Sequence, residues 1–154
     1  SMKKFILFLT LVAFLVIPAK ALAVESATAT MYQAGTWTVV KIVWVSHTDG
    51  TVSYTFSDMI MKKIRGMTIY IADTDPGATA PTSYSITFAN EYTVDIFGGS
   101  LSARSATVGE HAPPIIGGAY GERPIGQSLQ MEIVSAGNTK GGTVALWFRP
   151  DLWG

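Results

Sequence analysis

Two histidines are the side chains of this chain best suited to metal binding or proton transfer. His47 precedes an Asp-Gly turn sequence at residues 49–50, and His111 follows Glu110 in a long loop. Zinc sites bring histidine and carboxylate ligands into one compact set, and nothing in this spacing joins the two histidines. Each is expected to be a solvated loop residue, and the sequence predicts no metal ligands.

Carboxylates and glycines supply the other patterns that are associated with chemistry. Asp73 and Asp75 offer the oxygen ligands that Ca²⁺ prefers, but Asp before a Pro-Gly pair is ordinary turn chemistry. No EF-hand glutamate follows them. Residues 98–102 lack the closing glycine of a nucleophile elbow, and residues 117–121 lack the Lys-Ser/Thr pair of a phosphate loop. None of these patterns predicts a catalytic or phosphate site.

The chain contains no cysteine, which excludes thiol catalysis and thiolate metal sites. These observations together predict no catalytic residues, no metal and no cofactor, so we expect a protein that is not an enzyme. The alternative is a hydrolase whose acidic residues meet only in the folded chain, because any two carboxylates brought together can act as a pair. Without disulfides, the domain must depend on packing or oligomerisation for its stability.

The N-terminus has the order of an export signal. Ser1 is typical of a residue left by a cleaved tag, Lys3 and Lys4 follow, residues 5–17 are apolar apart from one threonine, and residues 21–23 read Ala-Leu-Ala. This apolar run is shorter than the roughly 20 residues that span a membrane. Residues 1–23 are therefore predicted to be a cleaved signal peptide, with an uncleaved membrane anchor as the alternative.

Loss of residues 1–23 changes the net charge of the chain. It removes Lys3, Lys4 and Lys20, which leaves 8 basic against 11 acidic residues and a net charge near −3. Binding to nucleic acid requires a basic face, so no nucleic-acid partner is expected. The basic cluster at residues 62–65 is interpreted as the solvated end of a strand.

Alternation of apolar and polar side chains with period two dominates from Thr36 onward. Residues 24–35 are expected to be a flexible lead-in or an edge segment, and residues 36–154 a single domain. The pattern predicts a hairpin of residues 37–45 with 51–56 and a pairing of residues 129–134 with 144–148. Further strands are expected at residues 67–72, 83–88 and 93–97. The fold class is all-β, an antiparallel β-sandwich of jelly-roll or Ig-like type, preceded by an N-terminal hydrophobic signal or anchor helix.

Aromatic residues on the expected strands allow two interpretations. Trp37, Trp44, Tyr54, Tyr70 and Tyr84 mostly belong to the core, because the alternation already gives them an inner face. Aromatic rings left on the surface would instead stack on sugar rings and form a carbohydrate-binding face.

Residues 106–127 contain five glycines and three prolines, and a loop of this length is unusual in a compact domain. The loop is expected to mediate self-association, since its apolar side chains would otherwise form an exposed patch. The alternative is a lid folded over its own sandwich. The candidate interaction residues are Pro113, Pro114, Ile115, Ile116, Tyr120 and Ile125.

A further set of segments lies between residues 40 and 148, at residues 43–46, 75–87, 94–99, 104–107 and 136–144. In their order and spacing these segments resemble a family of small proteins encoded in tailed-phage and prophage genomes. The resemblance implies a structural, virion-associated role and no catalytic residues.

The sequence therefore favours a non-enzymatic structural protein of a phage or prophage particle, such as a decoration, head or tail accessory component. Its partners would be copies of itself or other virion proteins, with a membrane involved only through uncleaved residues 1–23. The export signal favours the alternative, an exported periplasmic or extracellular binding module for carbohydrate or a cell-surface partner. The expected location is accordingly outside the cytoplasm, secreted or membrane-anchored, or in the virion.

Overall fold

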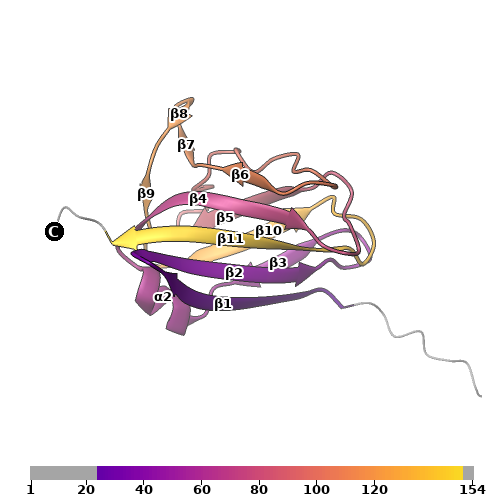
Figure 1. Cartoon of the computed structure of the whole chain (residues 1–154), viewed down its shortest axis with the longest axis horizontal. Helices are drawn as coiled ribbons and strands as arrows, with labels where there is room; N and C mark the ends of the chain where they lie inside the picture. Colours follow the sequence, from indigo (N-terminus) through magenta and orange to yellow (C-terminus); the bar gives the residue numbers. More distant parts are fainter. Residues whose placement is uncertain (1–23, 151–154) are drawn as a thin grey trace, which may run out of the picture.

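A computed structural model describes residues 24–150, which form two antiparallel sheets packed face to face (Figure 1). The expected all-β antiparallel fold is therefore confirmed. The expected signal or anchor helix at residues 1–23 lies outside the described residues. Within residues 24–150, no helix is long and apolar enough to cross a membrane. The larger sheet has the order β1 (Ser26–Ala34), β2 (Trp37–Val45), β11 (Gly141–Pro150), β4 (Met67–Pro76) and β6 (Glu110–Ala112), and β9 (Arg123–Pro124) also pairs with β4.

The smaller sheet has β10 (Leu129–Val134) at its centre, between β3 (Val52–Thr55) and β5 (Ser85–Asn90). Alternate side chains of both sheets point into the space between them. Val40, Ile42 and Trp44 of β2 have at most 1% of their surface exposed, whereas Lys41 between them is exposed. The period-two pattern therefore gave the inner faces of the strands correctly.

Both expected strand pairings are wrong. Strand β2 pairs with β1 and β11 instead of β3, and β10 pairs with β3 and β5 instead of β11. The Asp-Gly turn does form, with His47 N–H donating to the Thr51 carbonyl, but its two flanking strands enter different sheets. Period two says which face of a strand is buried, and it does not say which strand lies beside it.

Two interpretations of single segments are also corrected. Residues 93–97 form no strand beyond one isolated bridge from Asp95 to Ala89. A turn follows at once, because the Asp95 carboxylate accepts hydrogen bonds from the backbone N–H groups of Phe97 and Gly99. The basic cluster lies at the end of helix α2 (Asp58–Ile64), where Lys62 and Lys63 occupy the last turn. Positive charge there is favourable to the helix dipole.

The lead-in segment is ordered over most of its length. Residues 26–34 form strand β1, which lies at the edge of the larger sheet and pairs with β2 along all nine residues. Of the two alternatives that the sequence left open, a flexible lead-in and an edge segment, the structure has the edge segment.

Candidate functional site

The long loop builds a small hairpin that stands out from the sandwich (Figure 1). Strands β7 (Ile115–Ile116) and β8 (Ala119–Tyr120) pair with each other and with no other strand of the described chain. The turn between them is Gly117-Gly118, and both residues have positive φ angles of 57° and 84°. Two consecutive positive φ values favour glycine and fit a tight two-residue hairpin turn. We call residues 113–122 the finger.

The base of the finger is fixed to the sandwich by backbone contacts. Ile115 N–H donates to the Phe97 carbonyl at 3.0 Å, which joins the finger to the sandwich, and Gly121 N–H donates to the Pro114 carbonyl at 3.1 Å, which closes the finger at its own base. A Cβ atom on Gly98 would overlap the Ile115 carbonyl oxygen. The finger therefore begins at a close backbone approach that only glycine allows.

The structure divides the six predicted interaction residues into two groups. Ile116 and Tyr120 are 45% and 81% exposed, and Pro113 and Ile115 are partly exposed. Pro114 is buried. Ile125 is wrongly predicted as a contact residue, since it is 4% exposed and belongs to the core. Its N–H donates to the Met67 carbonyl, which fastens the end of the loop beside β4.

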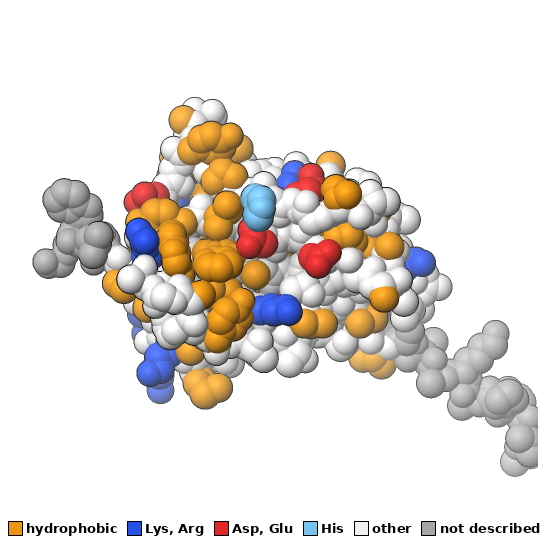
Figure 2. All heavy atoms as spheres, viewed as in Figure 1, with side chains coloured by type: hydrophobic (Ala, Val, Ile, Leu, Met, Phe, Trp, Pro, Cys, Tyr) orange, Lys and Arg blue, Asp and Glu red, His pale blue; other side chains and the backbone are white. Residues whose placement is uncertain are grey.

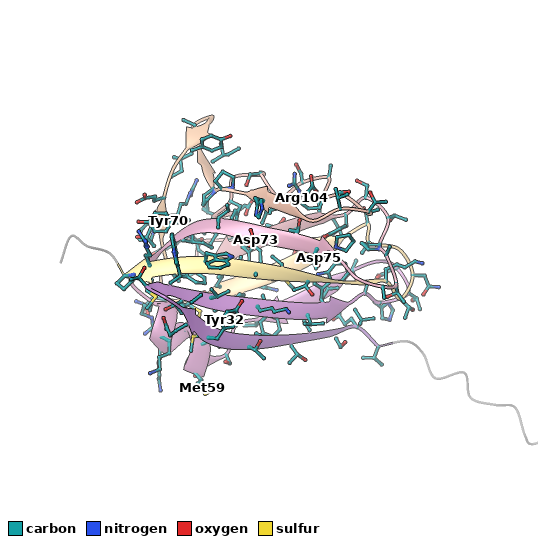
Figure 3. The ribbon with its side chains drawn as sticks, in the orientation of Figure 1. Tyr32, Met59, Tyr70, Asp73, Asp75 and Arg104 are labelled. Atoms are coloured by element: carbon teal, nitrogen blue, oxygen red, sulfur yellow. The ribbon has the colours of Figure 1, made fainter. Side chains whose placement is uncertain are left out.

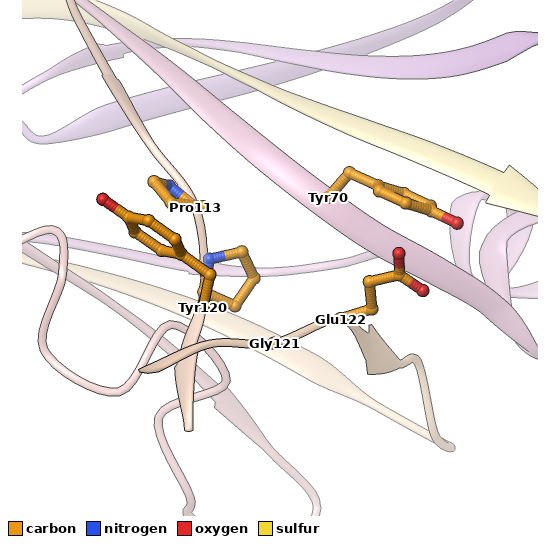
Figure 4. A pocket seen from close by; sticks show the side chains of 6 residues that line it. Tyr70, Pro113, Tyr120, Gly121 and Glu122 are labelled. Atoms are coloured by element: carbon orange, nitrogen blue, oxygen red, sulfur yellow. The ribbon is translucent and has the colours of Figure 1, made fainter. Parts of the chain in front are cut away.

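A hollow of about 250 Å³ separates the finger from the larger sheet (Figure 4). It is smaller than the roughly 300–1,000 Å³ of a drug-sized pocket, so it has room for a group about the size of one ring. Tyr70 and Glu122 lie on one side, and Pro113 and Tyr120 on the other. The hollow thus combines aromatic surface with one carboxylate. Its complete lining is Tyr70, Pro113, Pro114, Tyr120, Gly121 and Glu122.

Beside the hollow, three aromatic rings gather on the outer face of the larger sheet. Figure 2 shows apolar side chains grouped at the same end of the molecule as the finger. The ring of Trp37 meets Tyr70 edge-on with 5.2 Å between centroids and Trp147 with 6.1 Å. The Arg149 guanidinium lies 4.1 Å from the centre of the Trp37 ring, within cation–π range. We call Trp37, Tyr70 and Trp147 the aromatic face.

The prediction that most aromatic residues of the strands belong to the core is confirmed for some of them and wrong for others. Trp44 and Tyr84 are buried, as predicted, and Tyr54 packs against the core. Trp37 and Tyr70 are partly exposed on the other side of the sheet. For Tyr70 the cause is a β-bulge, because Trp147 pairs with Ile71 and the next residue pairs with Ile69, so the register shifts at Tyr70 and its side chain points to the outer face.

The Asp73 carboxylate connects the aromatic face to His111, a contact that the sequence did not predict. Asp73 accepts a hydrogen bond from Trp147 Nε1 at 2.8 Å, and its other oxygen lies 2.5 Å from His111 Nδ1. The cause is the pairing of β4 with β6, which sets Asp73 opposite His111. Tyr70, Asp73 and Asp75 follow one another along β4 (Figure 3). His111 is solvated as expected, with 76% of its side chain exposed, but it lies on strand β6 and one of its ring nitrogens contacts Asp73.

The contacts of Asp73 indicate that its carboxylate holds the Trp147 indole in position. Both of its oxygens are engaged, and the bond to Trp147 directs the indole from β11 across the sheet toward β4. The His47 ring lies beside its own turn, with Nδ1 3.5 Å from Asp49 Oδ1, and the His47 carbonyl accepts a hydrogen bond from Thr139 N–H. Among the described residues no three His, Asp or Glu side chains are grouped to hold a metal ion.

Comparisons of the chain with protein-family models, with curated proteins and with solved structures found no match. The resemblance to phage proteins therefore stays a prediction.

Proposed function

We propose that this chain is a non-enzymatic structural module that self-associates, and that it serves as a decoration, head or tail accessory component of a phage or prophage particle. The observation that carries the proposal is the finger. It exposes Ile116 and Tyr120 on two-residue strands that no other strand of the described chain supports. A lone two-stranded hairpin is marginally stable in water, so a neighbour that covers it would stabilise both its backbone and its apolar side chains.

The strand order supports this role at the level of the fold. In an immunoglobulin sandwich the last two strands lie side by side in one sheet, whereas β10 and β11 lie in different sheets here. Successive strands that alternate between the two sheets fit the jelly-roll alternative better. Jelly rolls occur in viral capsid proteins and also in lectins, so the fold agrees with a particle component without specifying it.

Light scattering on the protein tests self-association through the finger. The protein should be oligomeric at tens of micromolar, and Ile116→Asp should weaken association at least tenfold, because it places a charge in the contact. Val108→Asp is the matched control, since Val108 is also exposed, at 59%, but lies outside the finger. A monomeric protein would reject self-association, and an unaffected Ile116→Asp oligomer would reject the finger as its cause.

A second candidate function, an exported binding module for carbohydrate, is favoured by a separate observation. The hollow and the aromatic face place ring surfaces beside the Glu122 carboxylate and the exposed His111 imidazole. Apolar ring faces flanked by a few polar groups are typical of sites that hold a small ligand. In this proposal a sugar ring lies against Tyr120 and its hydroxyls bond to Glu122.

An array of immobilised bacterial glycans tests the second candidate. Tyr120→Ala should weaken glycan binding at least tenfold, whereas Tyr92→Ala should not change it. Tyr92 is a fair control because it is 76% exposed and lies in the turn after β5. Absence of binding to every glycan, or equal losses in the two variants, would remove this candidate.

A further inference from the structure

We propose that strand β1 of one copy pairs with β1 of a second copy, antiparallel about a two-fold axis, so that the two larger sheets become continuous. The inference rests on the self-association proposed above, but it names a contact that is separate from the finger. Strand β1 is the edge of the larger sheet, and none of the other described strands lies beyond it.

Strand β1 lacks the devices that usually protect an edge. Proteins blunt exposed edges with short strands, charged residues, prolines, bulges or a covering segment. Residues 26–34 read SATATMYQA, which contains no charged residue and no proline. Their pairing with β2 is regular over nine residues, without a bulge. A long, flat and uncharged edge is a template for another strand.

The opposite edge of the same sheet shows the contrast. Of the strands within residues 24–150, β6 and β9 alone lie beyond β4, and they have three and two residues. They carry charged residues, Glu110 and Arg123, and one proline, Pro124. This edge is protected in three of the usual ways, so the two edges of the larger sheet differ, and the β1 edge is the unprotected one.

One face of strand β1 is packed against the core, and its other face is exposed. Ala27, Ala29 and Met31 pack against the core, which fixes one face of β1. Thr28, Thr30 and Tyr32 on the other face are exposed. An edge that is fixed in this way loses little freedom when a partner strand binds.

The side chains of β1 are complementary to themselves in the fully overlapped register. A two-fold axis through Thr30 places Thr30 opposite its own copy, and it places each larger side chain opposite a smaller one. No like-charged pair arises, because the strand has no charge. This complementarity favours a second copy of the chain as the occupant of the edge. The facing pairs are Tyr32 with Thr28, Met31 with Ala29, and Gln33 with Ala27.

Single cysteines test the register directly, because the chain has no cysteine of its own. Thr30→Cys should form a covalent dimer on mild oxidation, since directly opposed residues have Cα atoms about 4.5–5.5 Å apart and a disulfide spans that distance. Thr28→Cys is the matched control, because two copies of residue 28 would be roughly 13 Å apart, at about 3.3 Å per residue. Thr28→Cys combined with Tyr32→Cys should again form the dimer. Equal cross-linking of Thr30→Cys and Thr28→Cys, or none of Thr30→Cys, would overturn the proposal.

A charge variant tests the same contact without cross-linking. Thr30→Glu places its carboxylate beside Lys41, the cross-strand neighbour within the same copy, so the isolated domain should fold normally. In the dimer the two introduced carboxylates would face each other, and association should weaken at least tenfold. Thr28→Glu, which would face Tyr32, should have a much smaller effect.

The outcomes separate the two proposals. An oligomer that Ile116→Asp dissociates and that Thr30→Glu leaves intact would overturn β1 pairing and retain self-association. A monomeric protein in light scattering, without a disulfide from Thr30→Cys, would overturn both. A Thr30→Cys dimer together with an unaffected Ile116→Asp oligomer would support β1 pairing and reject only the finger.

Discussion

Gly98 is the residue on which the position of the finger depends most. Its φ of 61° is in the left-handed region, and its Cα approaches the backbone of Ile115 so closely that a side chain would overlap the carbonyl oxygen. Gly99 also has a positive φ, of 83°, but nothing lies within 4 Å of the place where its Cβ would be. A comparison of Gly98 with Gly99 therefore separates the effect of the left-handed backbone from the effect of the close contact with Ile115.

We expect Gly98→Ala to lower the free energy of unfolding by about 2–4 kcal/mol, because it combines left-handed strain with a backbone overlap. Gly99→Ala should cost only the strain, about 1–2 kcal/mol. Denaturant unfolding of the two variants measures the difference. Equal losses would show that the approach to Ile115 does not constrain the chain.

Glu91 is expected to make stability sensitive to acid. Its carboxylate accepts hydrogen bonds from its own backbone N–H and from those of Ser128 and Gln127, and with Arg65 these lower its pKa below 4.5. A carboxyl with a lowered pKa stabilises the folded state above its unfolded pKa, and this contribution is lost as the pH falls through the folded pKa.

Denaturant unfolding between pH 3 and pH 7 checks this expectation. The free energy of unfolding should decline below pH 4.5. Glu91→Gln should make this decline with pH less steep, because the amide does not titrate in this range. Glu132→Gln removes a carboxylate at an exposed site of β10 and serves as the control for the loss of one negative charge. A slope that Glu91→Gln does not alter would assign the acid sensitivity to other carboxyls.

Among the elements of the fold, two turns connect strands of the larger sheet to strands of the smaller sheet. The turn after β2 and the turn before β11 lie together, and Ser46 joins them. Its hydroxyl donates to the Gly137 carbonyl at 2.6 Å and accepts from Lys140 N–H at 2.9 Å. Ser46 is fully buried, so these backbone groups have their partner away from water.

Ser46→Ala should lower the free energy of unfolding by about 2 kcal/mol, because it leaves buried backbone groups without a partner. Ser53→Ala is the control. Ser53 is exposed and its hydroxyl accepts only from the Gln130 side chain, so a change within about 0.5 kcal/mol is expected. Thermal and denaturant unfolding measure both variants. A loss below 0.5 kcal/mol for Ser46→Ala would contradict the proposed role of this link.

At the scale of the whole molecule, the prediction that remains from the N-terminus is cleavage after Ala23. The motive is the order of Lys3 and Lys4, an apolar run and Ala-Leu-Ala at residues 21–23. Mass spectrometry of protein made with secretion intact should find a chain that begins at Val24. A full-length mass in the membrane fraction would favour the anchor instead.

The alternation of apolar and polar residues along a strand is enough to predict which of its side chains face inward. Period two predicted that Trp44 and Tyr84 belong to the core, and the Asp-Gly pair predicted the turn after β2, because both features depend on neighbouring residues. The sequence also singled out the loop that carries Ile116 and Tyr120. These are local properties of the chain, and no knowledge of the sheet order was required.

Which strands are neighbours became known from the folded chain. The candidate sites depend on this strand order, because strand pairing brings their residues together. Asp73 and His111 are 38 residues apart and meet because β4 pairs with β6. Tyr70 reaches the outer face through a bulge that exists only against β11. Ile125 belongs to the core because the loop returns to β4. Sheet pairing is formed by hydrogen bonds between distant segments, whose order local alternation does not encode.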